Sequence, residues 1–155
     1  MKKKRLIGRS DKADFPELDL FDIDIKIDTG AYTSAIHCHK IKEKEIDGER
    51  MISFVLLDPS HPQYNKKEYR AKIHKEKLVK SSNGKSQKRY IIKTKIVLFG
   101  KKYSIELSLS ERGEMRYPVL IGRKLLRRKF IVDSDLSNLS YQLKIQNSQQ
   151  LKKRK

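Results

Sequence analysis

The chain has 155 residues, which favours one domain that buries its own core without a disulfide or a structural metal. It contains 37 Lys and Arg against 19 Asp and Glu, and this net charge of +18 predicts an anionic partner. The single cysteine, Cys38, excludes an intrachain disulfide and favours a reducing compartment. No apolar stretch approaches the roughly 20 residues of a membrane span. We therefore expect a cytoplasmic protein that does not enter a membrane.

Both ends of the chain are basic. Lys2–Arg5 opens it and Lys152–Lys155 closes it, and such runs of one charge are typical of mobile tails. We expect a basic tail over residues 1–5, one domain over residues 6–145, and a second basic tail over residues 146–155.

The clearest strand signal covers residues 20–27. Apolar and charged residues alternate with a period of two, which is the pattern of a half-buried strand. The predicted core face carries Phe21, Ile23, Ile25 and Ile27. The strand leads directly into Asp28-Thr29-Gly30, where glycine permits a sharp turn.

Short strands and turn signals fill the rest of the chain. Asp47-Gly48 and Ser81–Gly84 predict hairpin turns, and Gly100–Lys102 predicts a third. Strands are expected at 51–57, 68–79, 90–98, 103–109, 117–121, 130–132 and 139–145. A short helix is expected at 123–129, where Leu125 and Leu126 lie among cations. This pattern predicts an all-β fold, either a small barrel or a sandwich.

The residue with the clearest chemical meaning is Asp28. An aspartate on a glycine turn at the end of a strand can project into a cleft. Two such carboxylates a few ångströms apart cannot both ionise comfortably, so they share one proton. The ionised member then accepts a proton from water while the protonated member donates one to the scissile carbonyl. Because the sequence has one Asp-Thr-Gly, the partner aspartate must come from a second chain in a two-fold homodimer.

Several segments together resemble those of retropepsins. Ile27-Asp28-Thr29-Gly30-Ala31 follows an apolar strand, and Val119–Leu126 carries an apolar-apolar-Gly-Arg segment that leads into a short helix. The chain is similar to a bacterial retropepsin-like family often labelled an ATP-dependent zinc protease. The matching blocks lie between about residues 6 and 136, and they are Ile7–Arg9, Lys26–Ala31, Thr33–His37, Ser81–Gly84, Arg89-Tyr90, Leu120–Phe130 and Asp133.

The resemblance implies a small closed barrel of the acid-protease type with one short C-terminal helix. It also implies an aspartic peptidase that works as a homodimer, with Asp28, Thr29 and Gly30 as the catalytic turn. Ala31, Tyr32, Arg89 and Arg123 are then the candidate substrate-binding residues. Because the family is associated with ligases that add glutamate to proteins, an acidic, glutamate-rich protein tail is a candidate substrate. The basic charge separately makes a ribosome a candidate partner.

Two features depart from the retropepsin pattern. Tyr32 stands where viral retropepsins commonly have an acidic residue that pairs with the arginine corresponding to Arg123. The region between the Asp28-Thr29-Gly30 turn and the Gly122-Arg123 segment is also longer than in a viral subunit. The Ser81–Gly84 turn in this region is either the tip of an active-site flap or an ordinary hairpin tip.

The sequence gives little support to a metal or a nucleotide. We expect no cofactor, because it contains no phosphate-binding glycine loop and no His-Glu-x-x-His motif. The weak metal candidates are His37, Cys38 and His39, but on a strand the two histidines would face away from Cys38. Two alternatives to the aspartic peptidase stay open: a non-catalytic basic barrel that binds RNA, a ribosome or an acidic protein, and a zinc peptidase.

Overall fold

The computed structural model describes residues 3–80, 83–111 and 116–153. The elements in chain order are β1 (Arg5–Ile7), β2 (Ser10–Phe15), the 3-10 turn η1 (Pro16–Leu18), β3 (Leu20–Ile27), β4 (Ser34–Ile46), β5 (Glu49–Leu56), β6 (Glu68–Lys72), β7 (Lys75–Lys80), β8 (Ser86–Leu98), β9 (Lys101–Ser110), β10 (Val119–Ile121), α1 (Arg123–Leu126), β11 (Phe130–Val132) and α2 (Leu139–Lys153). Neither helix in these ranges is long and apolar enough to cross a membrane.

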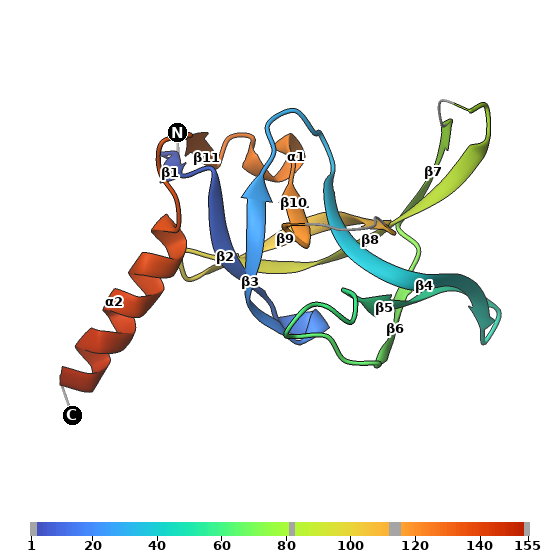
Figure 1. Cartoon of the computed structure of the whole chain (residues 1–155), viewed down its shortest axis with the longest axis horizontal. Coiled ribbons are helices and arrows are strands. Elements are labelled where there is room, and N and C mark those ends of the chain that lie inside the picture. Colours follow the sequence, from blue (N-terminus) through green and yellow to red (C-terminus); the bar gives the residue numbers. More distant parts are fainter. Residues whose placement is uncertain (1–2, 81–82, 112–115, 154–155) are drawn as a thin grey trace.

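Six strands in the described residues close into a barrel (Figure 1). Hydrogen-bonded neighbours follow in the order β10, β3, β2, β8, β9 and β4, and β4 pairs back with β10. The short strand β10 completes the ring, because Val119 pairs in parallel with Ile25 of β3 and antiparallel with Ile36 of β4. The predicted small closed barrel is confirmed.

The barrel interior is filled by the apolar members of the alternating strands. Ile23, Ile25 and Ile27 of β3 are buried, as are Ile92, Ile96 and Leu98 of β8 and Ile105, Leu107 and Leu109 of β9. Each fully buried aliphatic side chain contributes about 1.5–3 kcal/mol relative to exposure. Phe21 was expected in this core but is 52% exposed. The pairing of β2 with β3 shifts register between Ala13 and Phe15, and Asp22 has a positive φ of 51°, so Leu20 takes the core position instead.

Two hairpins extend beyond the barrel (Figure 1). The first joins β4 and β5 at Asp47-Gly48, where both residues have positive φ as the predicted turn requires. The second joins β7 and β8. The single strand predicted over 68–79 is therefore two strands, because β6 pairs with β5 whereas β7 pairs with β8. The turn between β8 and β9 lies at Phe99-Gly100, one residue earlier than expected.

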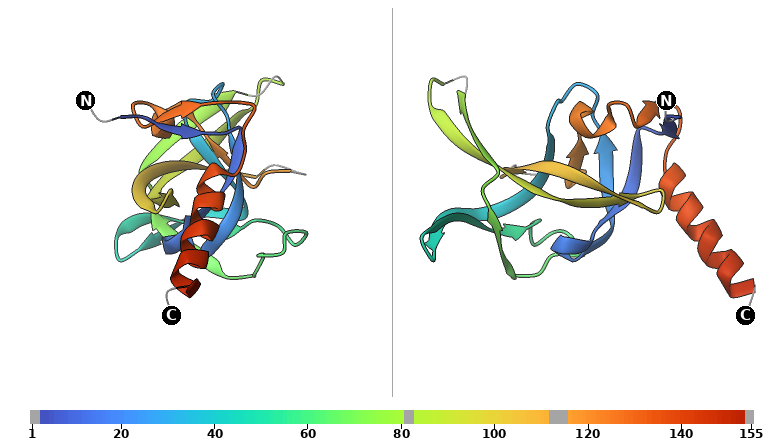
Figure 2. Two further views of the ribbon diagram at one scale, coloured as in Figure 1. Left: turned by 90° about the vertical axis from the view of Figure 1, so that its left-hand side faces the viewer. Right: turned by 180° about the vertical axis from the view of Figure 1, so that it is seen from behind.

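The C-terminal part contains the main error of the sequence prediction. The short helix expected after Gly122 is present as α1, and 130–132 is strand β11, which pairs in parallel with β1. However, Leu139–Ile145 is not a strand. It is the start of helix α2, which continues through the predicted basic tail to Lys153 and projects away from the barrel (Figure 2).

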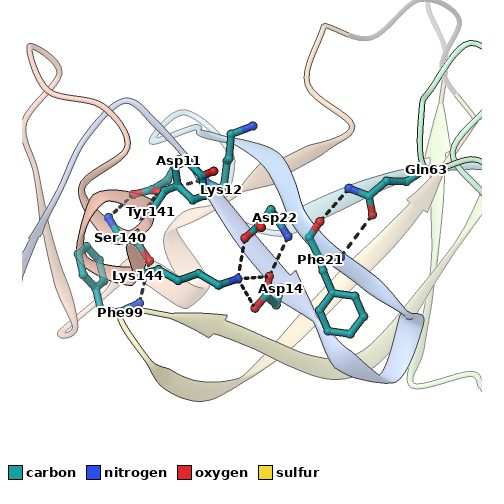
Figure 3. Close-up of polar contacts among 10 residues, drawn as sticks. All are labelled: Asp11, Lys12, Asp14, Phe21, Asp22, Gln63, Phe99, Ser140, Tyr141 and Lys144. Atoms are coloured by element: carbon teal, nitrogen blue, oxygen red, sulfur yellow. Dashed lines mark hydrogen bonds and ion pairs between the residues drawn. The ribbon is translucent and has the colours of Figure 1, made fainter. Parts of the chain in front are cut away.

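Helix α2 is anchored by polar contacts to strands far away in sequence (Figure 3). The buried carboxylate of Asp11 on β2 accepts hydrogen bonds from the backbone N–H groups of Ser140 at 2.9 Å and Tyr141 at 3.1 Å. The hydroxyl of Ser140 in turn accepts the N–H of Phe99 at 2.8 Å. Asp11 therefore caps the otherwise unpaired N–H groups of the first helical turn.

Candidate active site

Asp28 lies where β3 leaves the barrel. Its N–H donates to the carbonyl of Ile121 at 2.8 Å, which continues the pairing of β3 with β10 by one residue. Its Oδ1 atom accepts the N–H of Gly30 at 3.1 Å, and its carbonyl accepts the N–H of Ala31 at 3.2 Å. The barrel therefore fixes the backbone of Asp28, and the tight turn fixes its carboxylate.

The segment around Gly122 packs against this turn. The N–H of Gly122 donates to the buried hydroxyl of Ser34 at 3.0 Å. A Cβ atom on Gly122 would lie 2.5 Å from the carbonyl oxygen of Tyr32, so only glycine permits this close approach. The backbone N–H groups of Arg123 and Lys124 then donate to the carbonyls of Ala31 and Tyr32 at 2.8 and 2.9 Å. The two landmarks noted in the sequence thus form one interlocked unit.

Asp28 opens into a cleft of about 230 Å³ beneath the β7–β8 hairpin. The floor and walls come from the Asp28 turn, β4, β9 and β10, and the roof from alternate residues of β7 and β8. The lining residues are Asp28, Ala31, Thr33, Ala35, Lys77, Val79, Arg89, Ile91, Ser108 and Leu120. We call residues 75–91, as far as the structure describes them, the cleft hairpin.

The roof of the cleft carries a pair of cations. Lys77 and Arg89 are directly opposite each other across β7 and β8. Like charges in this arrangement repel each other. Within the described ranges, neither side chain has a carboxylate within ion-pair distance. An anionic ligand in the cleft would relieve this repulsion.

The outer face of the same hairpin is, by contrast, neutralised. Arg50 of β5 pairs with Glu43 and with Glu76 of β7, and Lys88 of β8 pairs with Glu76 at 3.3 Å. Arg50 and Glu43 are 56% and 32% exposed, so each of these ion pairs is weak by itself. Glu43 and Glu76 thus pair with cations on the outer face. Among the described residues, they leave Lys77 and Arg89 on the inner face without a carboxylate partner.

The structure brings together most, but not all, of the predicted site residues. Asp28, Ala31 and Arg89 share the cleft, whereas Thr29, Gly30 and Tyr32 lie beside it on the Asp28 turn and Arg123 lies at the start of α1. Arg123 donates from Nη1 to the carbonyl of Thr29 at 2.9 Å, and its guanidinium lies 5.8 Å from the ring centre of Tyr32. In this arrangement Arg123 secures the turn through the Thr29 carbonyl and lies over the ring of Tyr32. Ser81 and Ser82, half of the predicted flap tip, lie outside the described residues.

The three weak metal candidates do not converge. The Nε2 atom of His37 lies 2.9 Å from Oδ2 of Asp58, and Nδ1 of His39 lies 2.8 Å from the carbonyl of Leu57. Cys38 is fully buried in the core, and this burial raises the pKa of its thiol to about 12. Throughout the described ranges, no three His, Cys, Asp or Glu side chains gather in a group that could hold a metal ion.

A closed six-stranded barrel with Asp-Thr-Gly at the end of one strand, locked by Gly-Arg at the end of another, defines a retropepsin-like protein. The model of the RimB-like family, described as retropepsin-like aspartic endopeptidase RimB, matches residues 6–142. The chain belongs to this family.

Other known proteins share the domain. A protein from Shewanella pealeana named probable alpha-L-glutamate ligase is 37% identical over 134 residues, which cover 84% of this chain and 28% of that protein. A protein of the same name from Desulfotalea psychrophila is 32% identical over 133 residues, which cover 86% of this chain and 29% of that protein. The chain thus spans less than a third of these relatives. A crystal structure of a Legionella pneumophila protein of unknown function has the same fold, with a TM-score of 0.71, 23% identity, and coverage of 89% of this chain and 99% of that one.

Sequence reasoning missed two residues that the structure places near the site. Lys77 lines the cleft, and it could have been found from the candidate residue Arg89, because a hairpin register centred on Asn83 places Lys77 directly opposite it. Ser34 was included only within the matching block Thr33–His37. Its role as the acceptor for Gly122, 88 residues later, left no local signal.

Proposed function

We propose that the chain is an aspartic peptidase whose active site forms when two copies place their Asp28 carboxylates side by side, and that its substrate is a glutamate-rich peptide. The observation that carries this proposal is the cleft that Asp28 shares with the unneutralised cations Lys77 and Arg89. The names of the relatives, which are those of glutamate ligases, favour the same substrate class.

The chemistry follows from the shared proton. The ionised Asp28 removes a proton from a water molecule, and the water oxygen attacks the peptide carbonyl carbon while the protonated Asp28 donates to the carbonyl oxygen. In the second step the carbon–nitrogen bond breaks. The Asp28 that took the proton from water gives it to the leaving amine, and the other Asp28 takes a hydroxyl proton from the tetrahedral intermediate as the carboxyl product forms. Lys77 and Arg89 would hold side-chain carboxylates of the peptide, with Arg89 able to bind one through two hydrogen bonds.

Asp28→Asn tests the catalytic role. We expect loss of about a hundredfold to ten-thousandfold in the rate of cleavage of a fluorescent oligoglutamate peptide, because general acid–base catalysis contributes that much. Asp24→Asn on the same strand makes the same chemical change at a surface ion pair and should leave the rate unchanged. An Asp28→Asn protein that cleaves at the wild-type rate would show that Asp28 is only a turn residue.

Subunit mixing tests the shared site. If each site takes one Asp28 from each copy, activity in mixtures of wild type and Asp28→Asn should fall as the square of the wild-type fraction. Sedimentation at the assay concentration should then show a dimer, with or without the peptide. A linear fall in activity would indicate that each chain works alone.

Replacement of Lys77 or Arg89 by Met tests the substrate class. Each change should raise KM for an oligoglutamate peptide about tenfold, because a charge-assisted contact is lost. The same peptide with Gln in place of the flanking Glu residues provides the matched control, and its KM should not change. Equal effects on both peptides would remove the argument for carboxylate recognition.

A further inference from the structure

A carboxylate outside the cleft joins the two parts that form it. Glu106 lies on β9, and its side chain is 14% exposed. It pairs with Lys124 of α1, with Lys75 of β7 at 3.2 Å, and with His74 just before β7 at 3.3 Å. Three cationic or titratable groups from two separate elements thus meet at one acidic side chain.

One of these groups leads to the Asp28 turn. Lys124 follows Arg123 at the start of α1, and its backbone N–H donates to the carbonyl of Tyr32 at 2.9 Å. The same residue therefore holds the Asp28 loop through its backbone and Glu106 through its ammonium group.

The other two groups lead to the root of the cleft hairpin. Lys75 is the first residue of β7, and the backbone N–H of His74 donates to the carbonyl of Ile91 at 2.9 Å. Beyond this root the hairpin rises from the barrel, and most residues of β7 are exposed (Figures 1 and 2). The contacts at this root therefore set the angle between the cleft hairpin and the Asp28 turn.

The contacts at Glu106 are the better shielded of the two sets that hold the hairpin. The outer ion pairs of Arg50 involve a guanidinium that is 56% exposed, whereas Glu106 is largely covered. Attraction between charges is stronger where water is excluded, so removing the Glu106 charge should matter more than removing one outer charge. Lys75 and Lys124 would also be left close together without an anion between them.

We infer that Glu106 is a positioning residue that fixes the cleft hairpin relative to the Asp28 turn. This inference rests on the proposed function only in treating the cleft as the place where substrate binds. The contacts that support it are independent of what the protein cleaves.

Hydrogen exchange of the full chain, followed by mass spectrometry, tests the inference. In Glu106→Gln we expect exchange about tenfold faster in β7 and in the first half of β8, with β2 and β3 unchanged. Glu68→Gln is the matched control, since Glu68 pairs with Lys44 and Arg70 on the β5–β6 side, and it should leave hairpin exchange unchanged. Unchanged exchange in Glu106→Gln, or faster exchange throughout the barrel, would overturn the inference.

A second variant separates positioning from local stabilisation. Lys124→Gln removes the ammonium group through which α1 pairs with Glu106. If Glu106 couples α1 to the cleft hairpin, hydrogen exchange in the hairpin should be faster in Lys124→Gln too. The double variant Lys124→Gln/Glu106→Gln should then exchange little faster than Glu106→Gln alone. If hairpin exchange in Lys124→Gln matches wild type, Glu106 acts on the hairpin alone and the coupling is absent.

Kinetics provide the functional readout. Glu106→Gln should raise KM for the oligoglutamate peptide about tenfold and change kcat less, because the catalytic turn is intact while the roof is misplaced. A fall in kcat with unchanged KM would contradict a positioning role. If wild type cleaves no peptide, the proposed function fails, but the exchange results still decide whether Glu106 couples hairpin and turn.

Discussion

Cys38 illustrates how burial alone decides reactivity. Its side chain is completely covered, and burial raises the pKa of the thiol to about 12. At pH 8 the group therefore stays protonated, and a thiol reacts through its thiolate. We expect less than about a hundredth of the iodoacetamide labelling rate of a free peptide cysteine, as measured by mass spectrometry. Labelling in denaturant should be complete, and fast labelling of the native protein would show that the strand opens readily.

Single residues were predictable where a short motif carries the chemistry. Asp28 and Gly122 were identified from the residues directly around them. Lys77 and Glu106 carry no such motif, and their importance depends on which strand or helix comes to lie opposite. The candidate site was thus predictable at the Asp28 turn and at Arg89 of its roof, but the support from Glu106 was not.

Among the elements, α2 depends most on a distant residue. Asp11 accepts hydrogen bonds from the first turn of the helix while it is almost fully buried. Asp11→Ala leaves these N–H groups without a partner, and we expect a loss of about 1–3 kcal/mol in unfolding free energy, measured with urea. Asp135→Ala, which removes an exposed carboxylate, should change it by less than about 0.5 kcal/mol. Equal losses would show that the cap adds nothing.

The error at α2 has a clear physical origin. Leu139, Tyr141, Leu143 and Ile145 alternate with polar residues, so the segment has the period of a strand. The same leucines are also four residues apart and can share one helix face. Asp11 favours the helix over the strand, because it caps the first helical turn. It lies 129 residues before Ser140 in the sequence. The strands of the barrel were predictable because their alternation agrees with the contacts they form.

The link between β9, α1 and the cleft hairpin should be sensitive to acid. Lys124, followed by Lys75, lowers the pKa of Glu106 below its ordinary value, against the effect of burial. A carboxyl group with a lowered pKa stabilises the fold above its unfolded pKa, near 4.5, and loses this effect as pH falls through its folded pKa. The difference in unfolding free energy between wild type and Glu106→Gln should therefore be present at neutral pH and shrink as the pH falls below about 4.5. A difference that persists undiminished at about pH 3 would contradict the assignment.

At the scale of the whole molecule, the excess positive charge is distributed unevenly. Glu43, Glu76 and Glu106 neutralise the outer face and the root of the cleft hairpin, whereas its inner face has no carboxylate partner in the described residues. The net charge of +18 was evident from composition, but which surface holds uncompensated cations depends on strand pairing. Composition therefore favoured an anionic partner as an expectation without indicating a surface that could bind one.

The way the ring closes also determines when the protein can fold. Strand β3 ends at Ile27, yet its partner β10 begins at Val119, and β1 at the start of the chain pairs with β11 at Phe130–Val132. Contacts between residues so far apart in sequence are slow to form, because a long loop must close first. During synthesis the barrel therefore cannot close until most of the chain has emerged, and its apolar strands stay exposed until then. Synthesis of the last strands therefore decides when the nascent chain can bury these residues.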